Sequence, residues 1–236
     1  MVDYENASFE TPRIDLLEFE YTYVERKEYS RTSVAVNVVD DSGMEKELII
    51  GGTFYYPGWE GHIRAYDVTD MAISGSSYSE LKTITRSDPT DPTGREIVAA
   101  GVTIRWDAGE LLAARSPGNR NIYTAIPDGG GLARIDFTDA NAALLEPILD
   151  DYNGETVGLI NFIRGEGRSW KLGDINHSNP IVVGPPSGVA SLKGSEYDAF
   201  FAAHQARTKV MIVGSNDGML HCFDVLTGEE LWGFIP

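Results

Sequence analysis

The histidines and aspartates of the C-terminal quarter are the residues whose types come closest to a metal site. His177 lies three residues after Asp174, and His221 lies three residues before Asp224. A zinc site needs several Cys or His ligands at short, regular spacing, and these two pairs lie too far apart in sequence for any compact pattern. Histidines at strand ends usually form ordinary hydrogen bonds. The sequence therefore predicts no metal-binding residues.

Motifs for covalent or phosphate chemistry are missing from the sequence. No Gly-x-Ser-x-Gly nucleophile turn occurs. The glycine run at 129–131 precedes a predicted strand, so it lacks the helix N-terminus that binds phosphate. Cys222 is the single cysteine, which excludes an internal disulfide, and in a strand pattern it reads as a small core residue. We therefore predict no catalytic and no cofactor-binding residues.

Composition limits the partners. The chain has 236 residues, 42% of them hydrophobic, and a formal net charge of −17. A globular fold is expected, and a nucleic-acid partner is excluded because no cluster of Lys and Arg is present. No apolar run approaches the ~18 residues of a membrane helix, and residues 1–10 lack the apolar core of a signal peptide. For an exported protein, the signal would lie outside this chain.

The elements that position these residues are clearest at 210–236. Val210–Val213 and Met219–Val225 read as strands joined by Asn216-Asp217-Gly218, a tight turn that places Gly218 at positive φ. A second turn, Thr227-Gly228-Glu229, leads to a third strand. Its Trp232 is expected to be largely buried between stacked sheets.

This hairpin is repeated. Residues 61–68 match 218–225 in the order Gly, x, aliphatic, x, small, aromatic, Asp, Val, and 130–137 form a weaker copy. Ala108–Leu112 resembles the second turn, at 227–231. Repeated hairpins indicate propeller blades. The repeat glycines lie 69 and 88 residues apart, more than the roughly 40 to 50 residues of a simple blade, so insertions are expected.

Helical periodicity identifies the insertions at 139–149, 155–164 and 196–207. A strand at 177–184, entered through Pro180, completes a blade over 177–236 with an insertion at 185–208. Further strands are predicted at 14–23, 33–39 and 47–56, and a loop at 74–92. The predicted fold is all-β: a partial β-propeller with quinoprotein-dehydrogenase-like blades over 46–236, and unassigned N-terminal strands over 1–45.

Five segments resemble the C-terminal β-propeller of the PilY/PilC type IV pilus tip proteins. They are WDAGELLAAR (106–115), FTDANAAL (137–144), LINFIRG (159–165), LGDINHSNPIVVG (172–184) and the stretch 213–236. The resemblance implies a non-enzymatic, exported protein of the cell surface or pilus tip, associated with the outer membrane. The resemblance further implies a role in pilus assembly and often in adhesion, with pilus subunits, minor pilins, or host and surface ligands as the expected partners.

The same resemblance bears on individual positions. The family's calcium loop is expected downstream of residue 236, so no cofactor is expected in this stretch. The residues taken as the structural motif are Gly61, Asp67, Asp174, His177, Pro180, Asn216, Asp217, Gly218, Asp224, Gly228 and Trp232.

Two alternatives remain open. The repeat also resembles pyrroloquinoline-quinone dehydrogenases, but these enzymes stack the quinone on adjacent cysteines, and one cysteine cannot form that ring. A periplasmic propeller scaffold for outer-membrane assembly is the other alternative. The helical insertions and the 172–184 segment favour the pilus family over this scaffold.

Overall fold

The computed structural model describes residues 27–40, 42–56, 58–69, 103–149, 154–186 and 194–236. A first sheet is an antiparallel meander in the order β1-β2-β3-β4. Its strands are β1 (Lys27–Val39), β2 (Glu45–Tyr56), β3 (Glu60–Asp67) and β4 (Thr103–Asp107).

The second sheet has six strands in the order β6-β5-β10-β9-β8-β7. Its antiparallel meander comprises β7 (Ile181–Val183), β8 (Val210–Gly214), β9 (Leu220–Asp224) and β10 (Glu230–Ile235). The hairpin of β5 (Ile122–Asp128) and β6 (Gly131–Asp136) extends this sheet, because β5 pairs with β10. That pairing is parallel, whereas the sequence predicts only antiparallel neighbours for these strands.

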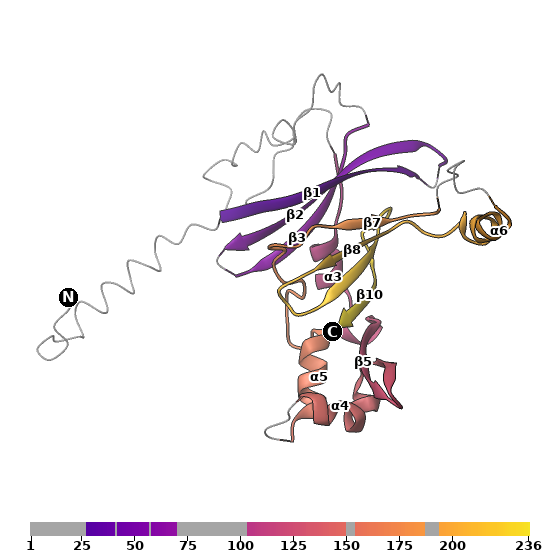
Figure 1. Cartoon of the computed structure of the whole chain (residues 1–236). Helices are drawn as coiled ribbons and strands as arrows, with labels where there is room; N and C mark the ends of the chain where they lie inside the picture. Colours follow the sequence, from indigo (N-terminus) through magenta and orange to yellow (C-terminus); the bar gives the residue numbers. More distant parts are fainter. Residues whose placement is uncertain (1–26, 41, 57, 70–102, 150–153, 187–193) are drawn as a thin grey trace, which may run out of the picture.

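The helices are α3 (Ala108–Ala114), α4 (Ala142–Leu149), α5 (Thr156–Arg164) and α6 (Ser195–His204), with short 3-10 turns at Pro117–Asn119 and Asp139–Asn141. Helices α4, α5 and α6 lie away from the sheets (Figure 1), whereas Ala108 and Leu112 of α3 belong to the core. The three predicted helical insertions are thus confirmed. Among the described helices, none is long and apolar enough to cross a membrane.

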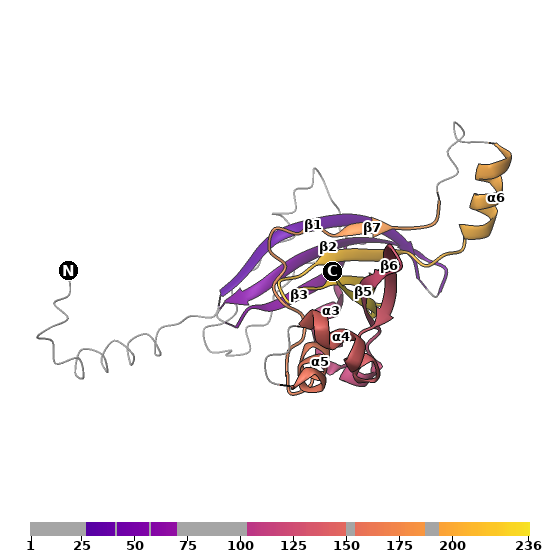
Figure 2. The same cartoon turned by 60° about the horizontal axis from the view of Figure 1, so that its bottom comes forward.

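The two sheets stack face to face, with β1 and β7, the first strand of each meander, side by side (Figures 1 and 2). One apolar cluster fills the interface, because alternate residues of each strand point to the same side. Its fully buried members include Leu48, Ile50, Ile63 and Ala65 from the first sheet and Met211, Val213, Phe223 and Val225 from the second. The described part is thus an all-β partial propeller whose sheets stack as neighbouring blades.

The two main repeats occupy the same place in their sheets, since 61–68 form β3 and 218–225 form β9. The repeat aspartate has the same task in both. Asp67 Oδ1 accepts from the backbone N of Thr69 at 3.1 Å, and Asp224 Oδ1 accepts from that of Leu226 at 2.7 Å. Each aspartate therefore fixes the turn that follows its strand.

Several local predictions need correction. The segment Ala108–Leu112, which resembles the second turn in sequence, lies in helix α3, because Asp107 caps this helix: Oδ1 of Asp107 accepts from the backbone N of Gly109 at 2.9 Å. The strand predicted over 177–184 is limited to β7, since His177 has a φ of 63° and cannot continue the extended chain. The predicted strand at 14–23 and loop at 74–92 lie outside the described residues.

Two boundaries can be compared with the sheets. Ile181 and Ile212 are paired partners in β7 and β8, so the strands on either side of the predicted insertion at 185–208 lie in one sheet. The division of the chain into 1–45 and 46–236 stays a prediction, and β1 pairs with β2 across that position.

Trp232, which the sequence predicts to be largely buried, is less buried than its repeat equivalent Trp106. Trp232 is half-buried, whereas Trp106 is 7% exposed. The two tryptophans have equivalent places, because Trp106 pairs with Ala65 and Trp232 with Cys222, the matching residue of the repeat. Trp106 is covered by the second sheet, where its Nε1 donates to the carbonyl of Val225 at 3.2 Å.

Gly218 and Gly228 both have positive φ angles, but only Gly228 is also needed for close packing. Gly218 has a φ of +87°, which confirms its predicted left-handed conformation, and open space surrounds the position of a Cβ. Gly228 has a φ of +75°, and a Cβ there would lie 2.5 Å from Cδ2 of Trp106. The close approach of Gly228 therefore makes room for the tryptophan that joins the sheets.

We expect Gly218→Ala to lower the free energy of unfolding by about 1–2 kcal/mol, the cost of a left-handed alanine. Gly228→Ala should cost about 3 kcal/mol or more, since the clash with Trp106 adds to that strain. Urea unfolding of the two variants measures the difference. Equal losses would show that the Trp106 contact contributes nothing.

Candidate functional site

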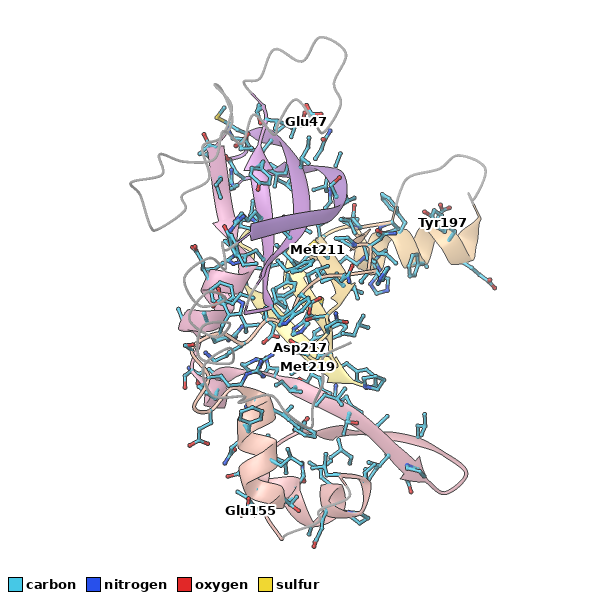
Figure 3. All side chains as sticks on the ribbon, turned by 90° about the vertical axis from the view of Figure 1, so that its left-hand side faces the viewer. Glu47, Glu155, Tyr197, Met211, Asp217 and Met219 are labelled. Atoms are coloured by element: carbon cyan, nitrogen blue, oxygen red, sulfur yellow. The ribbon has the colours of Figure 1, made fainter. Side chains whose placement is uncertain are left out.

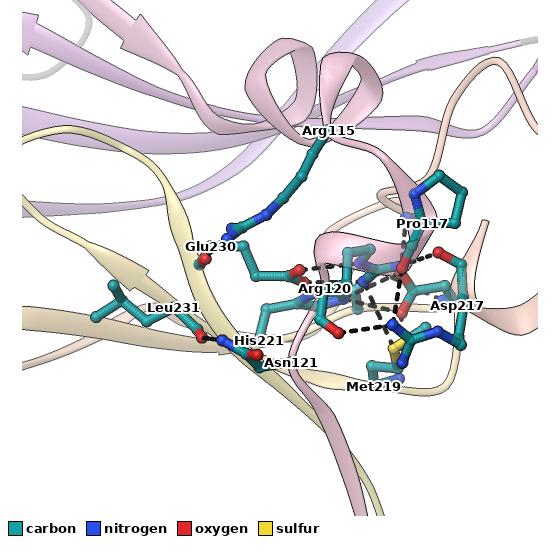
Figure 4. Close-up of polar contacts among 12 residues, drawn as sticks. Arg115, Pro117, Arg120, Asn121, Asp217, Met219, His221, Glu230 and Leu231 are labelled. Carbon is teal, nitrogen blue, oxygen red and sulfur yellow. Dashed lines mark hydrogen bonds and ion pairs between the residues drawn. The ribbon is translucent and has the colours of Figure 1, made fainter. Parts of the chain in front are cut away.

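A chain of buried charges joins the second sheet to the helical part of the molecule (Figure 4). Its members are Asp217 in the β8–β9 turn, His221 on β9, Glu230 at the start of β10, Arg120 ahead of β5, and Arg164 at the end of α5. Figure 3 shows Asp217 and Met219 at this junction, between the first sheet and the helical part, where Glu155 directly precedes α5.

His221 has a carboxylate on each side of its ring. Its Nε2 lies 3.0 Å from Oδ2 of Asp217, and its Nδ1 lies 2.9 Å from Oε1 of Glu230. The side chain is fully buried. Burial opposes the charge, but the hydrogen bonds and charges of Asp217 and Glu230 outweigh it and raise the pKa of His221 to about 9. The ring is therefore an imidazolium at neutral pH.

Glu230 also binds Arg120 through both of its oxygens. Arg120 donates from Nε to Oε2 at 2.9 Å and from a terminal nitrogen to Oε1 at 2.8 Å. Burial raises the pKa of Glu230, but hydrogen bonds from Arg120 and His221 prevail and lower it to about 2. Such a two-point pair fixes the distance and orientation of both side chains.

Arg164 connects this pair to the helices. Its guanidinium donates to the carbonyls of Phe137, Pro117 and Arg120, each at 2.8 Å. In return, Arg120 donates to the carbonyl of Arg164 at 3.0 Å. Because backbone carbonyls of separate segments meet on one side chain, Arg164 holds α5 against the start of β5 and the end of β6.

A second buried cluster occupies the matching place in the first sheet. Asp107 Oδ2 lies 2.6 Å from Nδ1 of His62 and accepts from Nε of Arg64 at 2.8 Å. Arg64 is the repeat equivalent of His221. Burial raises the pKa of Asp107, but its hydrogen bond to His62 and the charges of His62 and Arg64 lower it on balance. Each repeat thus places a cation on its third strand beside a buried carboxylate.

The surroundings of His221 are those of a structural group. Both ring nitrogens of His221 are held by carboxylates, and no solvent reaches the ring. Its two partners and the guanidinium beyond are all charged groups, so no hydroxyl or thiol is positioned as a nucleophile there. Over the described residues, no three His, Cys, Asp or Glu side chains are grouped to hold a metal. What these charges can do is fix the helices and turns that they join.

The structure places the residues of the predicted motif in different settings. Asn216 Nδ2 donates to Oδ2 of Asp174 at 2.7 Å, which ties the β8–β9 turn to the segment 172–176. Gly61 belongs to the same region, because its backbone N donates to the carbonyl of Leu172. Pro180 is buried, whereas His177 is exposed. The two histidines considered as ligands are thus not a pair.

Sequence reasoning missed most of the charge network. Arg120 and Arg164 approach Glu230 from separate segments, and no local pattern links them. Two signals were present: Arg164 is the only charged residue of the LINFIRG motif, and His221 shares the strand face of the buried Phe223.

Stability should fall as pH rises from 6.5 to 9. The folded pKa of His221 is raised above its unfolded value, so its contribution is complete below pH 6.5 and is lost as pH passes 9. The loss should be about 3 kcal/mol, measured by urea unfolding across this range. His221→Gln should remove the dependence, and His177→Gln, at an exposed histidine, should keep it. A slope unchanged in His221→Gln would contradict the charged state of this ring.

Arg164→Lys should loosen the helices while the sheets stay folded. A lysine keeps the charge but cannot donate to three carbonyls at once. We expect amide hydrogen exchange in α4 and α5 to speed up about 10- to 100-fold, with little change in β2 and β3. Arg168→Lys, beside Phe162 on the surface, is the matched control. Uniform loss of protection in both sheets would show that α5 is not a separate unit.

The amino-acid sequence of this chain is similar to those of several known proteins. The chain is 36% identical over 154 residues to the type IV pilus biogenesis factor PilY1 of Pseudomonas aeruginosa strain UCBPP-PA14, covering 57% of this chain and 13% of that protein. It is 40% identical over 120 residues to a PilY1 homolog of Xylella fastidiosa, covering 41% of this chain and 10% of the homolog.

A third relative, PilY1 of P. aeruginosa strain PAK, is 28% identical over 185 residues, or 75% of this chain and 15% of that protein. The chain thus matches a small fraction of the length of these relatives. No family model and no solved structure matches it. The names of these relatives agree with the family resemblance of the motifs at 106–236 and support membership of this chain in the PilY1 family.

Proposed function

We propose that this chain is part of a type IV pilus biogenesis factor and acts as a non-catalytic scaffold that binds partners. The observation that carries the proposal is the match to three proteins named as type IV pilus biogenesis factor PilY1 or its homolog. The fold supports it, because stacked blades give a rigid frame from which loops and insertions project.

The charge networks favour binding over catalysis. The described buried histidines and arginines are engaged in holding turns and helices to the sheets. The surface offers acidic and apolar groups instead, since the formal charge is −17 and α6 exposes Phe200. Pilus subunits, minor pilins, or host and surface ligands are the proposed partners, and the proposed location is the cell surface or pilus tip after export.

The alternatives are less well supported. A quinone-dependent dehydrogenase would need adjacent cysteines, and this chain has only Cys222. Cys222 is buried, and this burial is the main reason why its pKa is raised to about 11. A periplasmic scaffold for outer-membrane assembly fits the blades equally well but does not account for the named relatives. The calcium site implied by the family resemblance stays a prediction.

The proposal predicts that deleting the gene reduces surface pili and twitching motility. Sheared surface pilin and the width of the twitching zone measure the effect. Complementation with the wild-type gene should restore both, and Trp106→Ala, which removes the side chain joining the sheets, should restore them poorly. Phe200→Ala, at an exposed position of α6, is the matched control for general damage to the protein.

Normal piliation in the deletion strain would overturn the pilus role. Quinone-dependent oxidation of an alcohol by the purified protein would favour the dehydrogenase alternative. If pili are normal but outer-membrane proteins assemble poorly, the scaffold alternative becomes the better explanation.

A further inference from the structure

Strand β6 forms an edge of the second sheet that no described strand covers. The sheet order is β6-β5-β10-β9-β8-β7, so β6 has a neighbour on one side only. The chain is described without a break over 103–149, and the residues before and after β6 in this range do not pair with its free side. At the opposite edge, β7 has three residues and lies beside β1. The long open edge of this sheet is therefore β6.

Alternate backbone groups of β6 point away from β5. The backbone N of Phe137 donates to the carbonyl of Ile122 on β5, so this N–H faces β5. In an antiparallel pair, the N–H and C=O of one residue point to the same side, and this side alternates along the strand. Those of Leu132 and Arg134 therefore face the free edge. Over the described residues, no hydrogen bond reaches these outward backbone groups.

The edge also lacks the devices by which natural proteins prevent edge pairing. Those devices include proline, bulges, exposed lysines and very short strands. β6 has six residues, GLARID, without proline or lysine, and its register with β5 runs without a shift. The guanidinium of Arg134 is turned inward, because it lies 4.6 Å from the ring centre of Tyr123 on β5. Such an edge is a template for one more strand.

The side chains of β6 indicate what such a strand would carry. Leu132 is 75% exposed, more than any other large hydrophobic residue in the described part of the chain. On the other face of the strand, Ile135 packs against the apolar cluster that β5 shares with the helices, which holds β6 in place. A strand added to the edge would set one of its own side chains opposite Leu132. An apolar or β-branched residue at that position would bury both side chains.

We propose that an extended, uncharged segment of a partner protein pairs with β6 as a further strand of the second sheet. The formal charge of −17 repels an acidic partner, and Arg134 would lie beside a basic one. A second copy fits less well, since antiparallel pairing over the free residues sets Leu132 of one copy opposite Arg134 of the other. The proposal rests on the proposed binding role and gives it a surface and a class of partner.

Titration of the purified whole chain with an acetylated and amidated peptide of alternating threonine and valine tests the proposal. The peptide carries N-methyl groups on every second residue, so that one edge can pair with β6 and the other cannot pair with a second peptide. We expect NMR shifts at the amides of Leu132 and Arg134. Their hydrogen exchange should slow about tenfold at a peptide concentration roughly ten times the dissociation constant. The same peptide methylated on every residue should have neither effect.

Arg134→Pro removes an outward N–H and leaves the hydrogen bonds to β5, because proline is tolerated where the N–H of an edge strand faces away from the sheet. It should raise the dissociation constant about tenfold or more, the effect of one lost backbone hydrogen bond. Arg134→Thr is the matched control, because it removes the same cation and keeps the N–H, and it should bind like the wild type. Unchanged exchange at the inward amides of Ala133 and Ile135 checks that the hairpin is folded in both variants.

No shift at Leu132 and Arg134 at about 1 mM peptide would overturn the proposal. Equal binding by Arg134→Pro and Arg134→Thr would do the same, because the contact would then not use the backbone edge. Slower exchange of the two amides with rising protein concentration alone would assign the edge to a second copy instead. A failed titration leaves the pilus role intact, and normal piliation in the deletion strain leaves the titration result intact, so the two failures are distinguishable.

Discussion

The face-to-face contact between the two sheets is the interaction on which the rest of this structure depends. Each meander has an apolar side that must be buried, and the apolar sides of the two meanders bury each other. Trp106 makes the contact specific, because its ring needs the bare backbone of Gly228 and its Nε1 needs the carbonyl of Val225. The turn between β9 and β10 is thus shaped by a residue more than a hundred positions earlier.

The buried charges act at a second level, where the insertions meet the blades. Helices α4 and α5 share a small apolar cluster with β5 that includes Ile122, Leu145 and Ile160. Arg164, Arg120 and Glu230 then fix the position of that cluster relative to β9 and β10. Buried ion pairs add little net stability compared with apolar contacts, but one that loses a partner is costly. They therefore specify one arrangement of the insertion rather than adding to the strength of the core.

This division of roles agrees with the proposed binding role. His221 is flanked by two carboxylates, an arrangement that in a cleft would suit proton transfer. Here the ring is completely buried and both of its nitrogens lie within hydrogen-bonding distance of carboxylates, so the charge of His221 stabilises the folded structure. The same residue types can form a catalytic site or a structural link, depending on whether solvent and substrate can reach them. The packing of the surrounding strands and helices decides this.

The sequence by itself determined the local elements and the family. The repeated Gly-x-aliphatic-x-small-aromatic-Asp-Val motif predicted β3 and β9, because alternation and turn chemistry act over a few residues. The three helical insertions and the left-handed Gly218 follow for the same reason. The motifs from Trp106 onward identified the relatives, since family resemblance is a property of residue order.

The tertiary structure alone decided what depends on distant partners. Ala108–Leu112 became a helix because Asp107 caps it while also binding His62 and Arg64 from β3. The parallel pairing of β5 with β10 and the meeting of Arg120, Arg164 and Glu230 leave no local signal in the chain. Trp106 and Trp232 occupy the same place in the repeat, yet only Trp106 is buried. The difference lies in whether another sheet packs on that face, which the residues of a single strand cannot specify.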